Sequence, residues 1–140
     1  MSRNVVYHRI EPGESPPDNV IQPPFRAVVI AEAQGSAEWR ELISDWLAQS
    51  GCLYMMAWGM GCSSWDDSVD IANIKAFLPR EIPEDSFIMT TWHDRETLQE
   101  TFLFAKSWAL HSTIELERTL LLHISMQNRE RELLDTFAGA

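Results

Sequence analysis

Cys62, His93 and Asp94 are the residues whose types could support covalent catalysis in this chain. Cys62 stands just before a predicted helix, and a helix N-terminus lowers the pKa of a thiol. His93 follows a predicted strand, where Asp94 or Glu96 could orient its imidazole ring. A Cys62–His93 dyad is therefore one hypothesis for an enzymatic site. The simpler alternative is that Cys62 is a buried structural cysteine.

Other residues near the same predicted strand ends could line a small-molecule pocket, because such pockets combine aromatic walls with a few polar groups. The alternative is that the tryptophans close the top of the core. In that case the two adjacent aspartates would stabilise a helix N-terminus by roughly 0.3–1 kcal/mol each. The candidate ligand-binding residues are Glu32, Trp58, Gly59, Gly61, Trp65, Asp66, Asp67 and Trp92.

The motifs of well-known cofactor and metal sites are absent from the sequence. The glycine turn at Gly59–Gly61 has neither the dinucleotide fingerprint nor the P-loop spacing, and Asp66 and Asp67 would repel a phosphate. No HExxH or paired CxxC motif occurs, so we predict no metal site, and the sequence points to no particular cofactor. Cys52 and Cys62 flank a predicted strand that holds them roughly 20 Å apart. Because a disulfide needs its Cα atoms within about 7 Å, we predict two free thiols.

Hydrophobic patterning predicts four strand–helix units that would position these residues. We expect strands at 25–31, 52–58, 86–91 and 119–125, whose apolar runs are typical of strands buried on both faces. Ser36 and Gly51 are the predicted N-cap and C-terminal cap of the first helix. The later helices are predicted to begin at Ser63 or Ser64, which forms a capping box with Asp67, at Asp94 and at Asn128. His123 lies inside an apolar strand and is interpreted as structural.

This alternation predicts an α/β fold, a small three-layer sandwich around a mostly parallel sheet of four to five strands in flavodoxin-like or Rossmann-like order. Residues 25–140 form one α/β domain, preceded in 1–24 by a short strand and a proline-rich arm. We expect the order 2-1-3-4 for the four strands that begin at Phe25. That order separates the second and third strands by about 10 Å, so loops would have to bring Cys62 and His93 together. Ligands bind beyond the carboxyl ends of such strands.

Composition limits the classes of function. The chain has 140 residues, of which 45% are hydrophobic, and a formal net charge of −10. The negative charge disfavours nucleic acid and anionic membranes as partners, and it would attract a basic protein. No apolar stretch approaches the roughly 20 residues of a membrane helix, and no secretory signal is visible, so we expect a cytoplasmic protein. The sequence does not predict the oligomeric state.

Two functional classes follow from these observations. The first is an acidic protein-interaction or regulatory module. The second is a small-ligand-binding protein or an enzyme of hydrolase or transferase type, with its site around Cys62 and His93. A cavity of about 300 Å³ or more lined by Trp58, Trp92, Cys62 and His93 would favour the second class, and closed packing of these residues would favour the first.

Three stretches of the chain resemble a small bacterial family of uncharacterised domains. They are MMAWGMGCSSWDDSVD, FIMTTWHD and FAKSWALHSTIELERTLLLHIS, within roughly residues 25 to 125. The resemblance implies a bacterial origin and a single short domain. It implies no activity, ligand or residue role.

Overall fold

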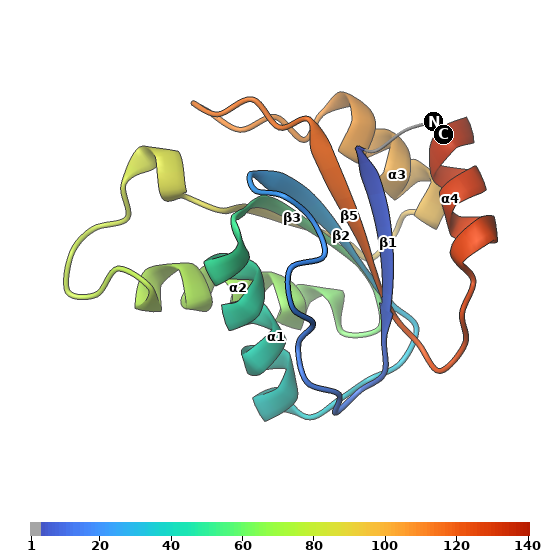
Figure 1. The fold of residues 1–140 in the computed structure, drawn as a ribbon, viewed down its shortest axis with the longest axis horizontal. Coiled ribbons are helices and arrows are strands. Elements are labelled where there is room, and N and C mark those ends of the chain that lie inside the picture. Colours follow the sequence, from blue (N-terminus) through green and yellow to red (C-terminus); the bar gives the residue numbers. More distant parts are fainter. Residues whose placement is uncertain (1–3) are drawn as a thin grey trace.

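A computed structural model describes residues 4–140 of the chain. Five strands and four α-helices alternate along most of it (Figure 1). The elements, in chain order, are β1 (Val5–Ile10), β2 (Phe25–Ala31), α1 (Ala37–Ser50), β3 (Cys52–Gly59), α2 (Cys62–Lys75), the short 3₁₀ helix η1 (Glu84–Ser86), β4 (Met89–His93), α3 (Leu98–Ser107), β5 (Arg118–Ile124) and α4 (Glu130–Gly139). The predicted α/β class is confirmed.

The five strands form one parallel sheet in the order β1-β5-β2-β3-β4. The expected order 2-1-3-4 was wrong, because the four strands from β2 onward are arranged 3-2-1-4, as in a Rossmann-like sheet. β3 and β4 are neighbours, with Trp58 in register with His93. β5 lies on the other side of β2, and β1 adds a fifth strand beyond it, so the strand order reverses between β2 and β5.

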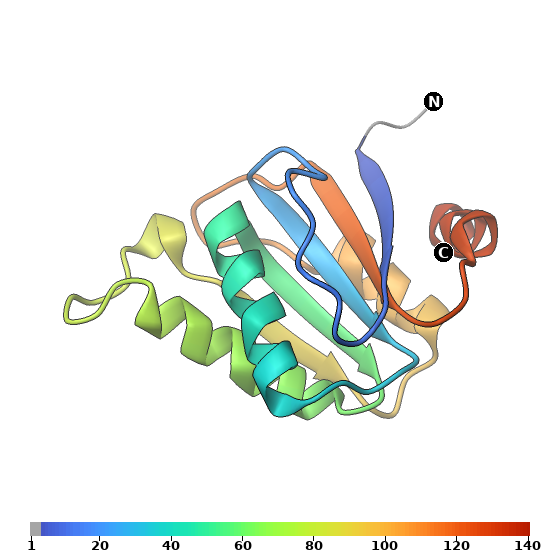
Figure 2. The same ribbon diagram turned by 60° about the horizontal axis from the view of Figure 1, so that its bottom comes forward.

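Helices cover both faces of the sheet, as Figure 2 shows. α1 and α2 pack together on one face, over a core that includes Val29, Met55 and Leu122. α3 and α4 cover the other face, over a core that includes Met56 and Phe102. Alternating residues of the central strands therefore enter different cores, which explains their continuous apolar sequences.

The proline-rich arm between β1 and β2 contains no helix or strand, but it is held to the domain. The indole Nε1 of Trp39 donates to the Glu14 carbonyl at 2.7 Å. Val20 and Ile21 pack against the core on the α1 side. These contacts attach the arm to the α1 side of the domain.

Both predicted ends of α1 were correct. The Ser36 hydroxyl accepts the Trp39 amide at 3.0 Å, and Gly51 is left-handed with φ 97°. The prediction of Ser63 or Ser64 as the α2 N-cap was wrong, because the helix begins at Cys62 directly after the left-handed Gly61.

Two later boundaries also differ from the prediction. Thr97, not Asp94, caps α3, and it forms a capping box with Glu100. The third predicted strand begins at Met89 rather than Ser86, because Ser86 ends the 3₁₀ turn η1. Asn128, the predicted N-cap of α4, lies one residue before the N-cap Arg129, and its side chain accepts the Glu130 amide at 2.9 Å.

Candidate functional site

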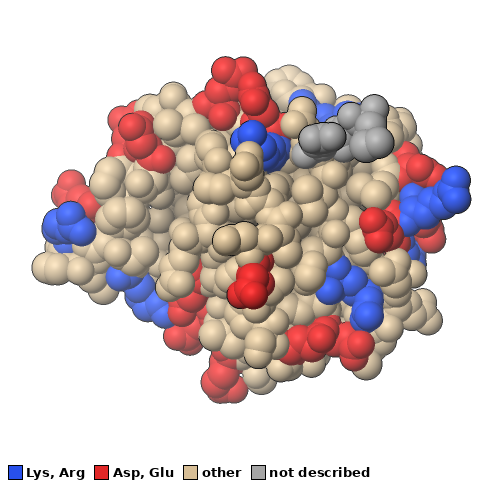
Figure 3. All heavy atoms as spheres, in the orientation of Figure 1, with Lys and Arg blue, Asp and Glu red and all other residues tan. Residues whose placement is uncertain are grey.

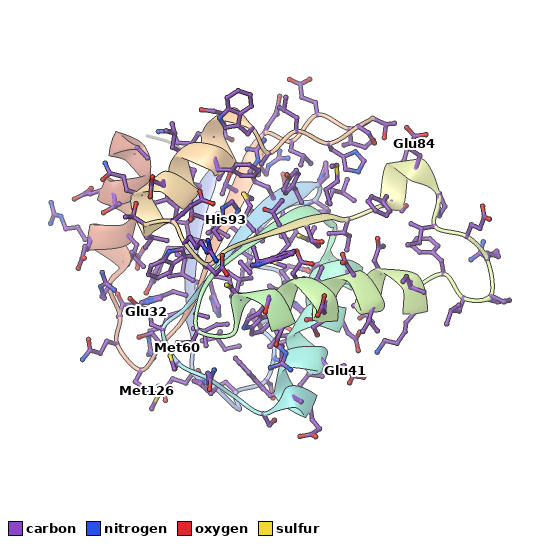
Figure 4. The ribbon with its side chains drawn as sticks, turned by 180° about the vertical axis from the view of Figure 1, so that it is seen from behind. Glu32, Glu41, Met60, Glu84, His93 and Met126 are labelled. Carbon is purple, nitrogen blue, oxygen red and sulfur yellow. The ribbon has the colours of Figure 1, made fainter. Side chains whose placement is uncertain are left out.

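The carboxyl ends of the strands meet at one edge of the sheet, as the sequence predicted. Figure 4 shows Glu32, Met60 and Met126 gathered at this edge, with His93 nearby, whereas Glu84 lies far away on the projecting segment. The side chains at this edge divide into two separate groups. One lies at the ends of β3 and β4, and the other at the ends of β1, β5 and β2.

His93 is the centre of the first group. It is 4% exposed, and both ring nitrogens have partners. Nδ1 lies 2.9 Å from Glu96 Oε1, and Nε2 lies 2.9 Å from the Thr91 hydroxyl. The imidazole packs against the ring of Phe104 on α3, with 4.8 Å between the ring centroids. His93 is thus oriented by Glu96, one of the two residues considered, whereas Asp94 is exposed.

The geometry does not support the proposed Cys62–His93 dyad. Cys62 is buried in the core under α1 and α2, whereas the His93 ring packs on the α3 face of the sheet. The Cys62 thiol interacts with the backbone of His93, while both ring nitrogens have other partners. Burial raises the pKa of the Cys62 thiol, and the charge of Asp94 raises it further. The expected lowering by the helix N-terminus was wrong, because loss of solvent dominates. Cys52 is also a free, buried thiol, as predicted.

Gly59 and Gly61 have structural roles in the turn that joins β3 to α2. Gly59 has φ 97°, and an added Cβ would lie 2.2 Å from the Ala31 carbonyl oxygen. That oxygen accepts the Met60 amide at 2.8 Å. Gly61 has φ 66° and accepts the Trp65 amide at 3.1 Å. Both residues have the positive φ that favours glycine, and this conformation lets the chain turn close to the end of β2.

The three candidate tryptophans do not form one aromatic wall. Trp58 donates from Nε1 to the Glu96 carbonyl at 2.8 Å. Trp65 is buried against Trp39 in an edge-to-face pair with 6.1 Å between the ring centroids. Trp92, on the edge strand, is 51% exposed. Five clefts on the surface of residues 4–140 are lined by other residues and not by Trp58, Trp92, Cys62 or His93.

Asp66 and Asp67 differ sharply in environment. Asp67 is exposed, whereas Asp66 is 5% exposed and its Oδ2 has no hydrogen-bond partner among residues 4–140. Burial raises the pKa of Asp66 to about 6, and repulsion from Asp70 contributes. Asp70 accepts the hydroxyl of Thr90 at 2.6 Å, which places a carboxyl pair between α2 and the edge strand β4.

The second group was missed by sequence reasoning, apart from Glu32. The buried ring of His123 lies 2.7 Å from the Tyr7 hydroxyl through Nδ1 and 2.6 Å from Glu32 through Nε2. Arg129 pairs with Glu32 at 2.5 Å and with Glu132 at 2.5 Å. Burial raises the pKa of Glu32, but hydrogen bonds from His123 and Arg129 outweigh this effect and lower it overall. His123 is therefore hydrogen-bonded as interpreted, but within an ionisable network.

A cleft of ≈ 440 Å³ adjoins this network. It lies at the ends of β2 and β5, where the strand order reverses, which is the usual ligand site of open α/β sheets. The sequence signal for it was the position of Glu32 after a strand, at the edge where ligands were expected. Its lining residues are Glu32, Ala33, Ser125, Met126, Gln127 and Arg129.

Residues 4–140 contain no group of three or more His, Cys, Asp or Glu side chains placed to hold a metal ion. Within the same residues, no helix is long and apolar enough to cross a bilayer. On the face in Figure 3, acidic and basic side chains of the described residues are interspersed, without a continuous basic area.

Comparison with known proteins identifies the family of this chain. A family described as a domain of unknown function, DUF7684, matches residues 5–140. The chain belongs to this family. The match includes β1 as well as the elements from β2 onward, and it confirms the resemblance to a family of uncharacterised domains. Neither a curated protein nor a solved structure shows significant similarity to the chain.

Proposed function

We propose that the chain is a protein-interaction module that binds an extended, basic segment of a partner protein along the edge strand β4. The observation that carries this proposal is an open strand edge beside exposed apolar side chains and a carboxyl pair, in which Asp66 is buried and Asp70 is partly exposed. β4 pairs with β3 on one side and is the last strand of the sheet. Such an edge offers unpaired backbone groups, and a peptide can bind them as an added strand.

Exposed apolar side chains gather around β4. We define the β4-edge surface as Ile74, Phe87, Met89 and Trp92. Trp92 is 51%, Ile74 50% and Phe87 46% exposed. A cleft of ≈ 400 Å³ between α2 and β4 is lined in part by Ile74, Phe87 and Met89. An exposed patch of this kind indicates an interaction site, and alternate side chains of an added strand would enter it.

Charge indicates a basic partner. Residues 66–96 contain eight Asp and Glu but three Lys and Arg, so this segment carries −5 of the net charge of −10. Asp70 lines the cleft, and the unpartnered Oδ2 of Asp66 lies one helical turn away. A Lys or Arg side chain of the bound segment would neutralise this carboxyl pair. Pairing of two copies through β4 is opposed by the repulsion between two chains of the same charge.

Display of a random peptide library against the purified chain tests the proposal. The selected peptides should alternate apolar and Lys or Arg residues, and they should protect the amides of Met89–His93 from hydrogen exchange. Trp92→Ala should weaken peptide binding at least about tenfold, because exposed aromatic residues are common energetic centres of interfaces. Trp108→Ala is the matched control, since Trp108 is 70% exposed on the C-terminal end of α3.

Peptides that protect another surface, or whose affinity is unchanged by Trp92→Ala, would contradict the proposal. Absence of any selected peptide with protection at β4 would do so as well. The alternative is that a second copy of the chain occupies the β4-edge surface. Sedimentation of the chain without peptide tests this alternative, because a dimer that dissociates in the Trp92→Ala variant would show it to be correct.

A further inference from the structure

A continuous hydrogen-bonded chain links a hydroxyl, an imidazole and a carboxylate across three strands. The hydrogen-bonded chain consists of Tyr7 on β1, His123 on β5 and Glu32 after β2. Tyr7 and His123 are 116 residues apart in the sequence, and His123 and Glu32 are 91 residues apart. Their contacts are 2.7 Å and 2.6 Å. A nucleophile within hydrogen-bond reach of a base, which is itself oriented by a third group, is the arrangement that activates hydroxyl nucleophiles.

The direction of the hydrogen bonds follows from the donors present. The backbone N–H of Arg129 donates to Tyr7 Oη at 3.1 Å. The Tyr7 hydroxyl can therefore donate its own proton to His123 Nδ1. His123 then carries its proton on Nε2 and donates it to Glu32. Burial raises the pKa of the Tyr7 phenol, so at neutral pH this hydroxyl is protonated and needs a base to react.

We infer that Tyr7 is a nucleophile for a neutral acyl donor, with His123 as its general base and Glu32 as the positioning residue. Tyr7 Oη would attack the carbonyl carbon of an ester, and its proton would pass to His123 Nδ1. The new O–C bond forms as the ester C–O bond breaks, and His123 delivers the proton to the leaving oxygen. Water then cleaves the tyrosyl ester, releasing the acid and restoring the phenol.

The charges of the cleft beside this network, which Glu32 joins to Tyr7 and His123, select the class of substrate. Arg129 lines the cleft next to Glu32, but its guanidinium is already paired with Glu32 and Glu132. No other Lys or Arg of the described residues lines this cleft. The negative charge of a phosphoryl group would therefore have no free cation to pair with in this cleft. An uncharged acyl group needs no such partner. Ala33 and Met126 provide apolar surface for its substituent.

This site is independent of the β4-edge surface, because β1 and β4 lie at opposite edges of the sheet. Either proposal can fail without the other.

Acetylation of the full chain by p-nitrophenyl acetate tests the inference, with p-nitrophenolate release followed over time and the acetylated residues located by peptide mass spectrometry. The chain has two tyrosines, and Tyr54 is buried, so Tyr54 is an internal control. Tyr7 should be acetylated at least about tenfold faster in the wild type than in Glu32→Gln, since an oriented general base contributes roughly 10²–10⁴-fold.

Glu132→Gln is the matched control, because Glu132 pairs with Arg129, whereas within residues 4–140 the His123 ring is hydrogen-bonded to Tyr7 and Glu32. It should leave the Tyr7 rate within about twofold, while Tyr7→Phe abolishes the fast phase. The inference is overturned if Tyr7 stays unmodified while lysines react. It is also overturned if Glu32→Gln, shown to be folded by circular dichroism, reacts at the wild-type rate.

Discussion

The buried carboxyl group of Asp66 makes the stability of the fold depend on pH in an unusual direction. Burial raises the pKa of this carboxyl group to about 6, well above its usual range, and the charge of Asp70 contributes. The folded state therefore keeps this proton up to a higher pH than the unfolded state does. Between about pH 4 and pH 6 the folded state binds more protons, so the free energy of unfolding decreases as the pH rises through this window.

Asp66→Asn should remove this dependence. The full shift corresponds to about 3 kcal/mol, at 1.36 kcal/mol per pKa unit. Solvent screening near the edge strand reduces it, so we expect about 1–3 kcal/mol. The variant should be more stable than the wild type by this amount at pH 8, or by roughly 3–10 °C in Tm. At pH 3.5 the two proteins should differ little, because an asparagine amide replaces a carboxyl that is already neutral.

Urea unfolding of both proteins from pH 3.5 to 8 measures this difference, with Asp67→Asn as the control. Asp67 is the next residue on α2 and is exposed. Its charge raises the pKa of Asp66 less than burial and the charge of Asp70 do, so its variant should keep most of the wild-type pH dependence. A stabilisation of Asp66→Asn that is equal at both ends of the pH range would refute the reasoning, and so would its absence at pH 8.

Three further predictions concern the core, a turn and a thiol. Phe102→Ala should lower the free energy of unfolding by about 3–5 kcal/mol in urea, because Phe102 is 0% exposed, whereas Leu103→Ala, at a residue 49% exposed, should change it by less than about 1 kcal/mol. Gly59→Ala should lower Tm more than Gly13→Ala; both have positive φ, but an added Cβ clashes only at Gly59. Cys52, whose pKa burial raises to about 12, should resist iodoacetamide in the folded protein at pH 8 and react after unfolding; fast native labelling would contradict its burial.

The parts of the fold that were predictable are those decided by neighbouring residues. Ser36 and Gly51 cap α1 because their side-chain and backbone chemistry acts within one helical turn. The errors at Ser64 and Asp94 have the same origin, because several polar residues lie near each helix start and the sequence does not rank them. α2 begins at Cys62 because the turn at Gly59 and Gly61 already directs the backbone into a helix.

The interpretation of candidate residues depended on the side of the sheet that each faces. Cys62 and His93 were paired because both follow strands, but they pack against different helices. Asp66 was considered either as a ligand-binding residue or as a stabiliser of a helix N-terminus, yet it is buried and faces Thr90 and Asp70. A rotation of one residue along a helix or strand reverses such an assignment, and composition alone does not reveal it.

The sequence by itself determined the alternation of strands and helices, the parallel sheet and the edge at which polar groups gather, because hydrophobic period and capping are local properties. Tertiary structure alone decided that β5 lies between β1 and β2. That placement brings together Tyr7, Glu32 and His123, and it leaves β4 as an open edge. The physical reason is that strand order depends on how helices pack across the whole sheet, between residues that are distant in sequence.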